Sequence, residues 1–161
     1  MSHPMIFAKT ASLFLLLALC MSCPPSRAQN QTPVNNGPVV DWTDSMTGLT
    51  WAKEVSEWFL TWNEAKAYCV NLRLGGHSDW RLPTIDELQG IYDPRVDVAG
   101  HSYGGEATIF HVKGNLKLTG VIWSSTQKND GQAWTFSFFD ASRGSHRLSE
   151  NNTERALCVR R

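Results

Sequence analysis

The sequence predicts an α+β fold in which two short helices pack on antiparallel strands. Two capping boxes, Thr61 with Glu64 and Thr84 with Glu87, each mark a helix start, because their side chains can bond unpaired amides there. From Gln132 to Phe139, aromatic residues alternate with small ones, the pattern of a half-buried antiparallel strand. Helices followed by antiparallel strands are typical of α+β domains.

The first 28 residues indicate an export signal. Lys9 precedes an apolar run, residues 13–19, that is too short to span a bilayer as a mature helix. Ser26-Arg27-Ala28 offers the small residues that signal peptidase prefers. We therefore expect a signal peptide over residues 1–28, cleavage before Gln29, and a protein that is secreted, periplasmic or on the cell surface.

The two cysteines of this leader leave a second route of export open. Cys20 or Cys23 could carry a lipid anchor, but Leu19 before the first and Cys20-Met21 before the second fit a lipobox poorly. We favour secretion without a lipid. Since no second hydrophobic span follows, we expect no membrane span after the signal is removed.

Residues 29–38 have no periodicity and are rich in turn formers, so they are predicted to be a disordered lead-in. Residues 39–161 are then one domain, long enough for a core of its own. Removing the leader, which holds Lys9 and Arg27, lowers the basic side chains from 15 to 13 against 15 acidic ones. A nearly neutral domain argues against a nucleic-acid binder.

Only Cys69 and Cys158 remain after the leader, an even pair in an exported chain, so a disulfide is expected between them. The two cysteines are too far apart in sequence for the usual two-cysteine redox or metal motif. We therefore interpret the bridge as structural.

The front of the domain is predicted as a hairpin and two helices. Residues 39–42 and 49–52 form the hairpin, and a helix starting at Trp62 buries Cys69. Gly75 and Gly76 are expected to close that helix, and residues 79–82 to form a very short strand with Trp80 and Leu82 inward. Pro83 ends the strand, and the second helix follows with Ile85, Leu88 and Tyr92 on its apolar face.

Between Asp93 and Gly120 the pattern fades, and glycines indicate a long loop of the kind that is often functional. Order returns in four predicted strands, at residues 121–125, 132–139, 145–148 and 155–159, with a hairpin turn at 140–144.

Several segments together resemble a known family: Thr47-Gly48-Leu49-Thr50-Trp51, residues 76–84, Trp123-Ser124-Ser125-Thr126, Ala133-Trp134 and Cys158-Val159-Arg160. In this order they are similar to the bacterial Lcl C-terminal domain family, named for a collagen-like adhesin, over Asp41 to Arg160. The resemblance implies a C-type-lectin-like fold with a bridge between the first helix and last strand. It also implies a surface or secreted context and, for the adhesin, binding of sulfated polysaccharides.

The chain lacks two features of related proteins, the collagen-like repeats of the adhesin and the calcium-binding motifs of animal lectins. It has no collagen-like repeats, so a trimerising stalk is not implied, and the oligomeric state stays open. It also lacks the Glu-Pro-Asn or Gln-Pro-Asp triplet and the Trp-Asn-Asp of calcium-dependent lectins. We therefore expect no calcium–sugar site.

Catalytic and metal motifs are also missing from the sequence. The histidines are scattered, without His-Glu-x-x-His, and Ser124 and Ser125 lack a Gly-x-Ser-x-Gly elbow. Asp86 and Glu87 are explained by the helix start. We expect no enzyme activity, no metal and no cofactor.

The predicted function is a bacterial binding module that recognises a glycan, for instance an anionic or sulfated one, or a protein partner without calcium. The alternative is a structural or assembly domain of a surface complex with no small ligand. Small hydroxyl and amide side chains suit sugar recognition, and clustered basic residues suit anions. The candidate ligand residues lie in the last third: Trp123, Ser124, Ser125, Thr126, Gln127, Trp134, Arg143, His146 and Arg147. Trp51, Trp62 and Trp80 are assigned to the core.

Overall fold

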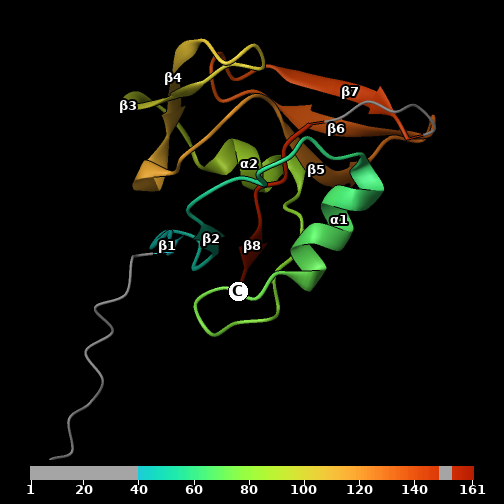
Figure 1. Ribbon diagram of the computed structural model, residues 1–161, viewed down its shortest axis with the longest axis horizontal. Helices are drawn as coiled ribbons and strands as arrows, with labels where there is room; N and C mark the ends of the chain where they lie inside the picture. Colours follow the sequence, from blue (N-terminus) through green and yellow to red (C-terminus); the bar gives the residue numbers. More distant parts are fainter. Residues whose placement is uncertain (1–39, 149–153) are drawn as a thin grey trace, which may run out of the picture. The chain divides into compact units, whose positions relative to one another are not determined.

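The computed structural model describes residues 40–148 and 154–161, and the predicted signal peptide (1–28) and lead-in (29–38) lie outside them. Figure 1 shows two helices among short antiparallel strands, which confirms the α+β class. In chain order the elements are β1 (Asp41–Thr43), β2 (Thr50–Ala52), α1 (Trp62–Asn71), α2 (Ile85–Gly90), β3 (Tyr92–His101), β4 (Ala107–Val112), the 3-10 helix η1 (Lys113–Asn115), β5 (Ile122–Gln127), β6 (Gln132–Phe136), β7 (Arg143–Arg147) and β8 (Val159–Arg160). Neither α-helix of this described part is long and apolar enough to cross a membrane.

The first and last strands belong to one sheet. β2 lies between β1 and β8 and pairs antiparallel with both. The β1–β2 hairpin confirms the sequence prediction, and the hydroxyl of Thr47 in its turn donates to the Asp44 carboxylate at 2.8 Å. Gly48 follows with a φ of 69°, which side chains other than glycine rarely allow.

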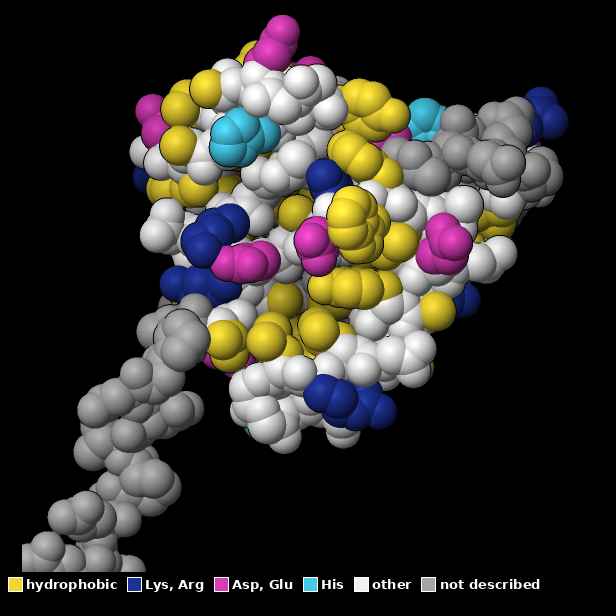
Figure 2. All heavy atoms as spheres, viewed as in Figure 1, with side chains coloured by type: hydrophobic (Ala, Val, Ile, Leu, Met, Phe, Trp, Pro, Cys, Tyr) yellow, Lys and Arg dark blue, Asp and Glu magenta, His cyan; other side chains and the backbone are white. Residues whose placement is uncertain are grey.

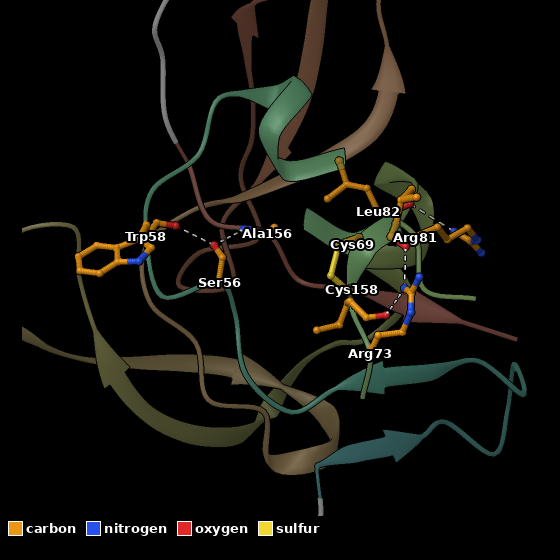
Figure 3. The surroundings of a disulfide bond; sticks show 10 residues. Ser56, Trp58, Cys69, Arg73, Arg81, Leu82, Ala156 and Cys158 are labelled. Carbon is orange, nitrogen blue, oxygen red and sulfur yellow. Dashed lines mark hydrogen bonds between the residues drawn. A yellow bond between two sulfur atoms is a disulfide. The ribbon is translucent and has the colours of Figure 1, made fainter. Parts of the chain in front are cut away.

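The predicted disulfide is present and joins α1 to the residue before β8 (Figure 3). Cys69 and Cys158 are 0% and 1% exposed, so the protein interior shields both sulfur atoms. Their separation of 89 residues makes this a long-range link. Chain-entropy reasoning gives such a closure a stabilisation of at most about 4–5 kcal/mol.

Both helices begin at the predicted capping boxes. The Thr61 hydroxyl accepts from the amide of Glu64, whose carboxylate accepts from the amide of Thr61. Thr84 and Glu87 exchange the same bonds at 3.2 and 2.8 Å. The local sequence therefore sets both helix starts.

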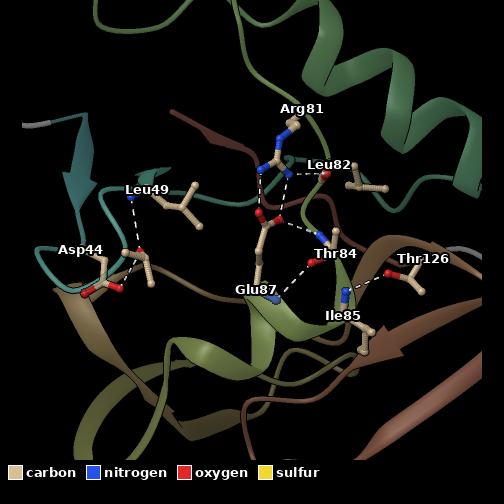
Figure 4. A network of polar contacts seen from close by, with 9 residues as sticks. Asp44, Leu49, Arg81, Leu82, Thr84, Ile85, Glu87 and Thr126 are labelled. Atoms are coloured by element: carbon tan, nitrogen blue, oxygen red, sulfur yellow. Dashed lines mark hydrogen bonds and ion pairs between the residues drawn. The ribbon is translucent and has the colours of Figure 1, made fainter.

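Glu87 has a second role, which Figure 4 shows. Its two carboxylate oxygens accept from the Arg81 guanidinium at 2.6 and 2.8 Å. Burial raises the pKa of Glu87, but hydrogen bonds from Arg81 and Thr84 outweigh it and bring the pKa below its usual value. The ionised carboxylate thus ties α2 to the segment before it.

The role predicted for Gly75 and Gly76 is wrong. α1 ends at Asn71, and the glycines, with φ of 61° and 79°, instead form the turn between Leu74 and His77. The amides of Leu74 and His77 donate to each other's carbonyl groups across this turn.

The very short strand predicted at residues 79–82 is a single backbone bridge. Arg81 pairs with Val159 there, and its neighbours make no ladder. The predicted alternation is confirmed, since Trp80 and Leu82 are 2% and 3% exposed. The segment lies against β8 as a buried connection.

The prediction of a long loop from Asp93 to Gly120 is wrong, because most of it forms the β3–β4 hairpin. Val98 and Phe110 from the two strands are buried in the core. Gly100 lies inside β3, where an added Cβ would be 2.4 Å from the carbonyl oxygen of Leu118. Close backbone packing, rather than a loop, explains that glycine.

β5, β6 and β7 form a separate antiparallel sheet in that order. The predicted inward positions Phe136 and Phe138 are fully buried, and Trp134 is half-buried. Ala133 and Thr135 on the opposite face are also buried, because that face packs against the cluster containing Trp62 of α1. The strand is therefore covered on both faces over much of its length.

Two clusters of buried side chains hold these elements together. The larger one lies among β2, α2, β3, β4 and β6 and includes Trp51, Leu88, Phe110 and Phe136. The smaller one surrounds the disulfide and includes Trp62, Trp80 and Trp123. Trp51, Trp62 and Trp80 are thus core residues, as predicted.

Candidate functional site

One face of the β5–β6–β7 sheet brings together part of the predicted ligand set. The register pairs Gln132 with Arg147 and Trp134 with Ser145, while Arg143 pairs with the last residue of β6. Paired residues and residues two apart on a strand point to the same side. These five residues therefore share one face, which we call the Trp134 face.

Lys128, from the β5–β6 turn, lies over the middle of the Trp134 face. Its Nζ is 5.0 Å from the centre of the Trp134 ring and 3.3 Å from Ser145 Oγ. A carboxylate oxygen of Asp130 is 3.6 Å from the same Nζ. Ser145 donates in turn to Gln132 Oε1 at 2.7 Å. These contacts hold the ammonium group above the tryptophan ring.

Arg143, Lys128 and Arg147 form a line of positive charges, which we call the cationic row. Arg143 and Arg147 lie at opposite ends of β7, about 13 Å apart at about 3.3 Å per residue, and Lys128 contacts Ser145 midway between them. Arg143 is directed to α2, where its Nη2 is 3.4 Å from Asp86 Oδ1 and also bonds Gln89. Asp86 and Asp130 offset part of the charge, so the row is moderately positive.

Four other predicted residues serve the fold. Trp123 is 1% exposed and donates from its indole to the Leu60 carbonyl at 2.7 Å. Ser124 is 0% exposed, and its carbonyl accepts from the indole of Trp62. The Ser125 amide donates to the Pro83 carbonyl, and the Thr126 hydroxyl accepts from the Ile85 amide at 3.0 Å. These four residues therefore do not belong to the candidate site.

His146 lies on the face of β7 opposite Trp134. Its ring meets Trp123 edge-on at 5.7 Å between ring centroids, and its Nε2 is 3.1 Å from a carboxylate oxygen of Glu154. Burial raises the pKa of the Glu154 carboxyl to about 7. The predicted grouping of His146 with the two arginines is therefore not found.

Gln127, at the end of β5, is exposed, but it pairs with Ala133 and so lies on the side of the sheet opposite Trp134. With Lys128, Asn129 and Asp130 it lines a shallow hollow of about 430 Å³. Of the predicted residues Ser124 to Gln127, only Gln127 is exposed, while Ser124 is buried and the two between them are half-buried.

Sequence reasoning missed a group of exposed aromatic residues. Tyr103 and Phe139 are 70% and 58% exposed and line a cavity of about 250 Å³. The Phe59 ring packs at a tilt against Tyr103, with 4.7 Å between ring centroids, and lies under the Arg155 guanidinium at 3.9 Å. Trp58 beside it is 70% exposed, and Figure 2 shows hydrophobic side chains gathered over the segment between β2 and α1. The sequence signal that could have revealed this group is the pair Phe138-Phe139, which breaks the alternation of aromatic and small residues along the strand.

Within residues 40–148 and 154–161, no three His, Cys, Asp or Glu side chains come together in a way that could hold a metal ion. The positive and polar groups of the Trp134 face are suited to hold an anion or a hydroxyl-rich ligand by hydrogen bonds.

Comparison with known proteins identifies the family. A search of curated proteins gives no match. The family model of the Lcl C-terminal domain matches residues 41–160, which is nearly all of the described structure. The chain therefore belongs to the Lcl C-terminal domain family, whose members are associated with bacterial surface or adhesin-like modules.

Proposed function

We propose that this domain is a non-catalytic, extracellular binding module that holds an anionic glycan, for instance a sulfated one, on the Trp134 face without calcium. The observation that carries the proposal is the cationic row, in which three positive groups follow one strand on one face. Sulfate and carboxylate groups repeat along an acidic polysaccharide, so a row of cations can contact several of them at once. Each exposed contact is weak alone, and several together give useful affinity.

The surroundings of Lys128 support a carbohydrate rather than a simple ion. The Trp134 ring is half-buried under the Lys128 ammonium group, and Gln132 and Ser145 supply an amide and a hydroxyl group on the same face. Because Ser145 and Gln132 are already bonded to each other, little side-chain ordering remains to be done on binding.

The test is a titration with heparin as the anionic probe and dextran as the neutral one. We expect heparin to bind with an affinity that falls as salt rises, since salt screens exposed charges. The double variant Arg143→Gln/Arg147→Gln should lose at least about tenfold in affinity, and a chelator should change nothing. Arg73→Gln/Arg95→Gln, which removes two arginines elsewhere, is the matched control.

Equal heparin affinity in both double variants would refute the cationic row as the site. Loss of binding on chelation would refute the calcium-independent mechanism.

The second candidate function is a structural or assembly domain that contacts a protein partner. The exposed side chains of Trp58, Tyr103 and Phe139 favour it, because aromatic residues are enriched in protein interfaces. A triple substitution of these residues by serine that abolishes assembly, while heparin binding persists, would support this candidate.

We also propose that the fold is C-type-lectin-like and that the protein is exported. The bridge between α1 and the start of β8, together with the hairpin that brings β1 beside β2, supports the fold assignment. A disulfide in the domain supports export to an oxidising compartment.

A further inference from the structure

The cavity of about 250 Å³ beside the β3–β4 turn has aromatic walls that solvent can reach. Tyr103 in that turn and Phe139, which follows β6, both line it and are 70% and 58% exposed. Phe110 of β4, which is 2% exposed, lines it from the core. The volume is below the roughly 300–1,000 Å³ of sites for drug-sized ligands, so the cavity suits one side chain rather than a chain of sugars.

Two carboxylates flank this cavity. The Asp140 side chain is exposed and hydrogen-bonds to Ser137, which lines the cavity. Hydrogen bonds from Ser142 and Ser137 bring the pKa of Asp140 below its usual value, so this carboxylate is ionised at neutral pH. Glu106 is exposed in the β3–β4 turn, and its carbonyl accepts from the hydroxyl of Thr108, another lining residue, at 3.3 Å. The rim of the cavity is therefore negatively charged.

Among the described residues, no lysine or arginine lines the cavity. Arg155 contacts the aromatic group from outside, through Phe59, whose ring packs against Tyr103. Its guanidinium lies 3.9 Å from the centroid of the Phe59 ring and already donates to backbone carbonyls. The aromatic group thus holds one guanidinium on Phe59, while the rings of Tyr103 and Phe139 are covered by no cation of the described chain.

An arginine side chain from outside matches this combination. A guanidinium stacks on aromatic faces, and carboxylates bind it through charge-assisted hydrogen bonds. The methylene stem of the same side chain packs on apolar walls. We propose that the cavity receives an arginine side chain of a protein partner, held by the rings of Tyr103 and Phe139 and by the carboxylates of Asp140 and Glu106.

A protein partner is favoured over a free amine, because the exposed aromatic surface continues beyond the cavity. Trp58 is 70% exposed, and Phe59 next to it packs against Tyr103. Figure 2 shows acidic side chains next to the hydrophobic side chains that gather on this face. Aromatic residues and arginine are both enriched in protein interfaces. The inference goes beyond the glycan proposal and rests on the second candidate function, to which it gives the chemistry of the partner.

The probe is the peptide acetyl-Gly-Arg-Gly-amide, titrated into the millimolar range while NMR follows the backbone amides of the ¹⁵N-labelled protein. We expect saturable shifts of the amides of Gly105, in the β3–β4 turn, and Gly120, which lines the cavity. The amide of Gly48, in the β1–β2 turn, is the internal reference and should stay in place. The same peptide with citrulline for arginine keeps the shape but loses the charge, so it should bind at least about fivefold more weakly.

The double variant Tyr103→Ser/Phe139→Ser should abolish the saturable shifts. Its other amide resonances should match those of the parent protein, because both replaced side chains are exposed. Asp140→Asn should weaken binding about threefold, since it removes one carboxylate from the rim. The matched control is Asp79→Asn, which removes an exposed carboxylate that bonds Arg160 outside the cavity and should leave peptide affinity unchanged.

Equal affinity for the arginine and citrulline peptides, or unchanged binding by the double serine variant, would overturn the proposal. Heparin titration keeps this result apart from the cationic row, because the double serine variant leaves the row intact and should bind heparin as the parent does. If the triple serine variant loses assembly but the parent protein does not bind the arginine peptide, the second candidate function stands and this inference fails.

Discussion

At the scale of single residues, the Trp80 ring joins the segment before α2 to the smaller core cluster. It is 2% exposed, its indole donates to the carbonyl of Leu74, and the Arg160 guanidinium lies 5.9 Å from its ring centroid. Such a ring cannot be removed without leaving a cavity, because the rest of the cluster is held by a disulfide and by α1.

Trp80→Ala should therefore lower the free energy of unfolding by about 3–5 kcal/mol. Chemical denaturation measures the change. Trp58→Ala is the matched control. Because Trp58 is 70% exposed, this substitution should lower the free energy of unfolding by less than about 0.5 kcal/mol. Similar losses in the two variants would contradict the assignment of Trp80 to the core.

Glu154 gives the protein a pH dependence of defined sign. Burial raises the pKa of its carboxyl from the ordinary 4.5 to about 7, so the folded state favours the protonated form. The resulting stabilisation is fully present below about pH 4.5 and is lost as the pH rises through 7. Glu154→Gln cannot ionise, and its melting temperature should fall less than that of the parent protein between pH 5 and 8.

The control is Glu106→Gln, which changes an exposed carboxyl in the β3–β4 turn. It should reproduce the pH dependence of the parent protein. Parallel melting curves for the parent and Glu154→Gln across this range would show that Glu154 has no such effect.

At the scale of secondary-structure elements, α2 depends on its first turn more than on its length. The helix has six residues, so its backbone bonds alone stabilise it weakly. The Thr84 hydroxyl, Glu87 and the Thr126 hydroxyl satisfy amides at its start. Because α2 carries Asp86, its start also positions the contact with Arg143 at one end of the cationic row.

Thr84→Ala should lower the free energy of unfolding by about 1 kcal/mol, through loss of the N-cap hydrogen bond. Denaturation measures this loss, and hydrogen exchange should show faster opening of the α2 amides than of those in α1. Thr84→Ser, which retains a capping hydroxyl, should restore most of the stability. Failure of serine to restore it would assign the effect to packing of the methyl group.

The elements also show what local sequence can predict. The capping boxes and the β1–β2 hairpin depend on interactions between residues that are close in sequence, and both were predicted correctly. The β3–β4 hairpin was missed because Gly100 resembles a loop glycine, although the carbonyl of Leu118 makes it necessary. The position of Lys128 over Trp134 was missed too, because it depends on strand register and on a turn whose geometry the sequence does not reveal.

At the scale of the whole molecule, the disulfide lies within the smaller core cluster and links residues that are 89 positions apart in the chain. Cys69 lies in α1. Cys158 directly precedes β8, which pairs with β2. The pairing was predictable, because only two cysteines follow the leader. The sheet next to the bridge was not predictable, because β2, which pairs with the last strand, is distant from it in sequence.

The double variant Cys69→Ala/Cys158→Ala should lose up to about 4–5 kcal/mol of unfolding free energy. Calorimetry or chemical denaturation tests this loss. Because both sulfur atoms are buried, mild reductant should leave the folded protein oxidised, and mass analysis after alkylation should find no free thiol until denaturant is added. Ready alkylation of the native protein would contradict the burial of the bridge.

The same bridge has a mechanical consequence. A force that pulls residues 40 and 161 apart acts on β1 and β8, which flank β2 in one sheet. Once those strands separate, the disulfide carries the tension directly from α1 to the end of the chain. Residues between Cys69 and Cys158 then bear no load, so the sheet β5–β6–β7, with the Trp134 face, would keep its shape while the rest of the domain is stretched.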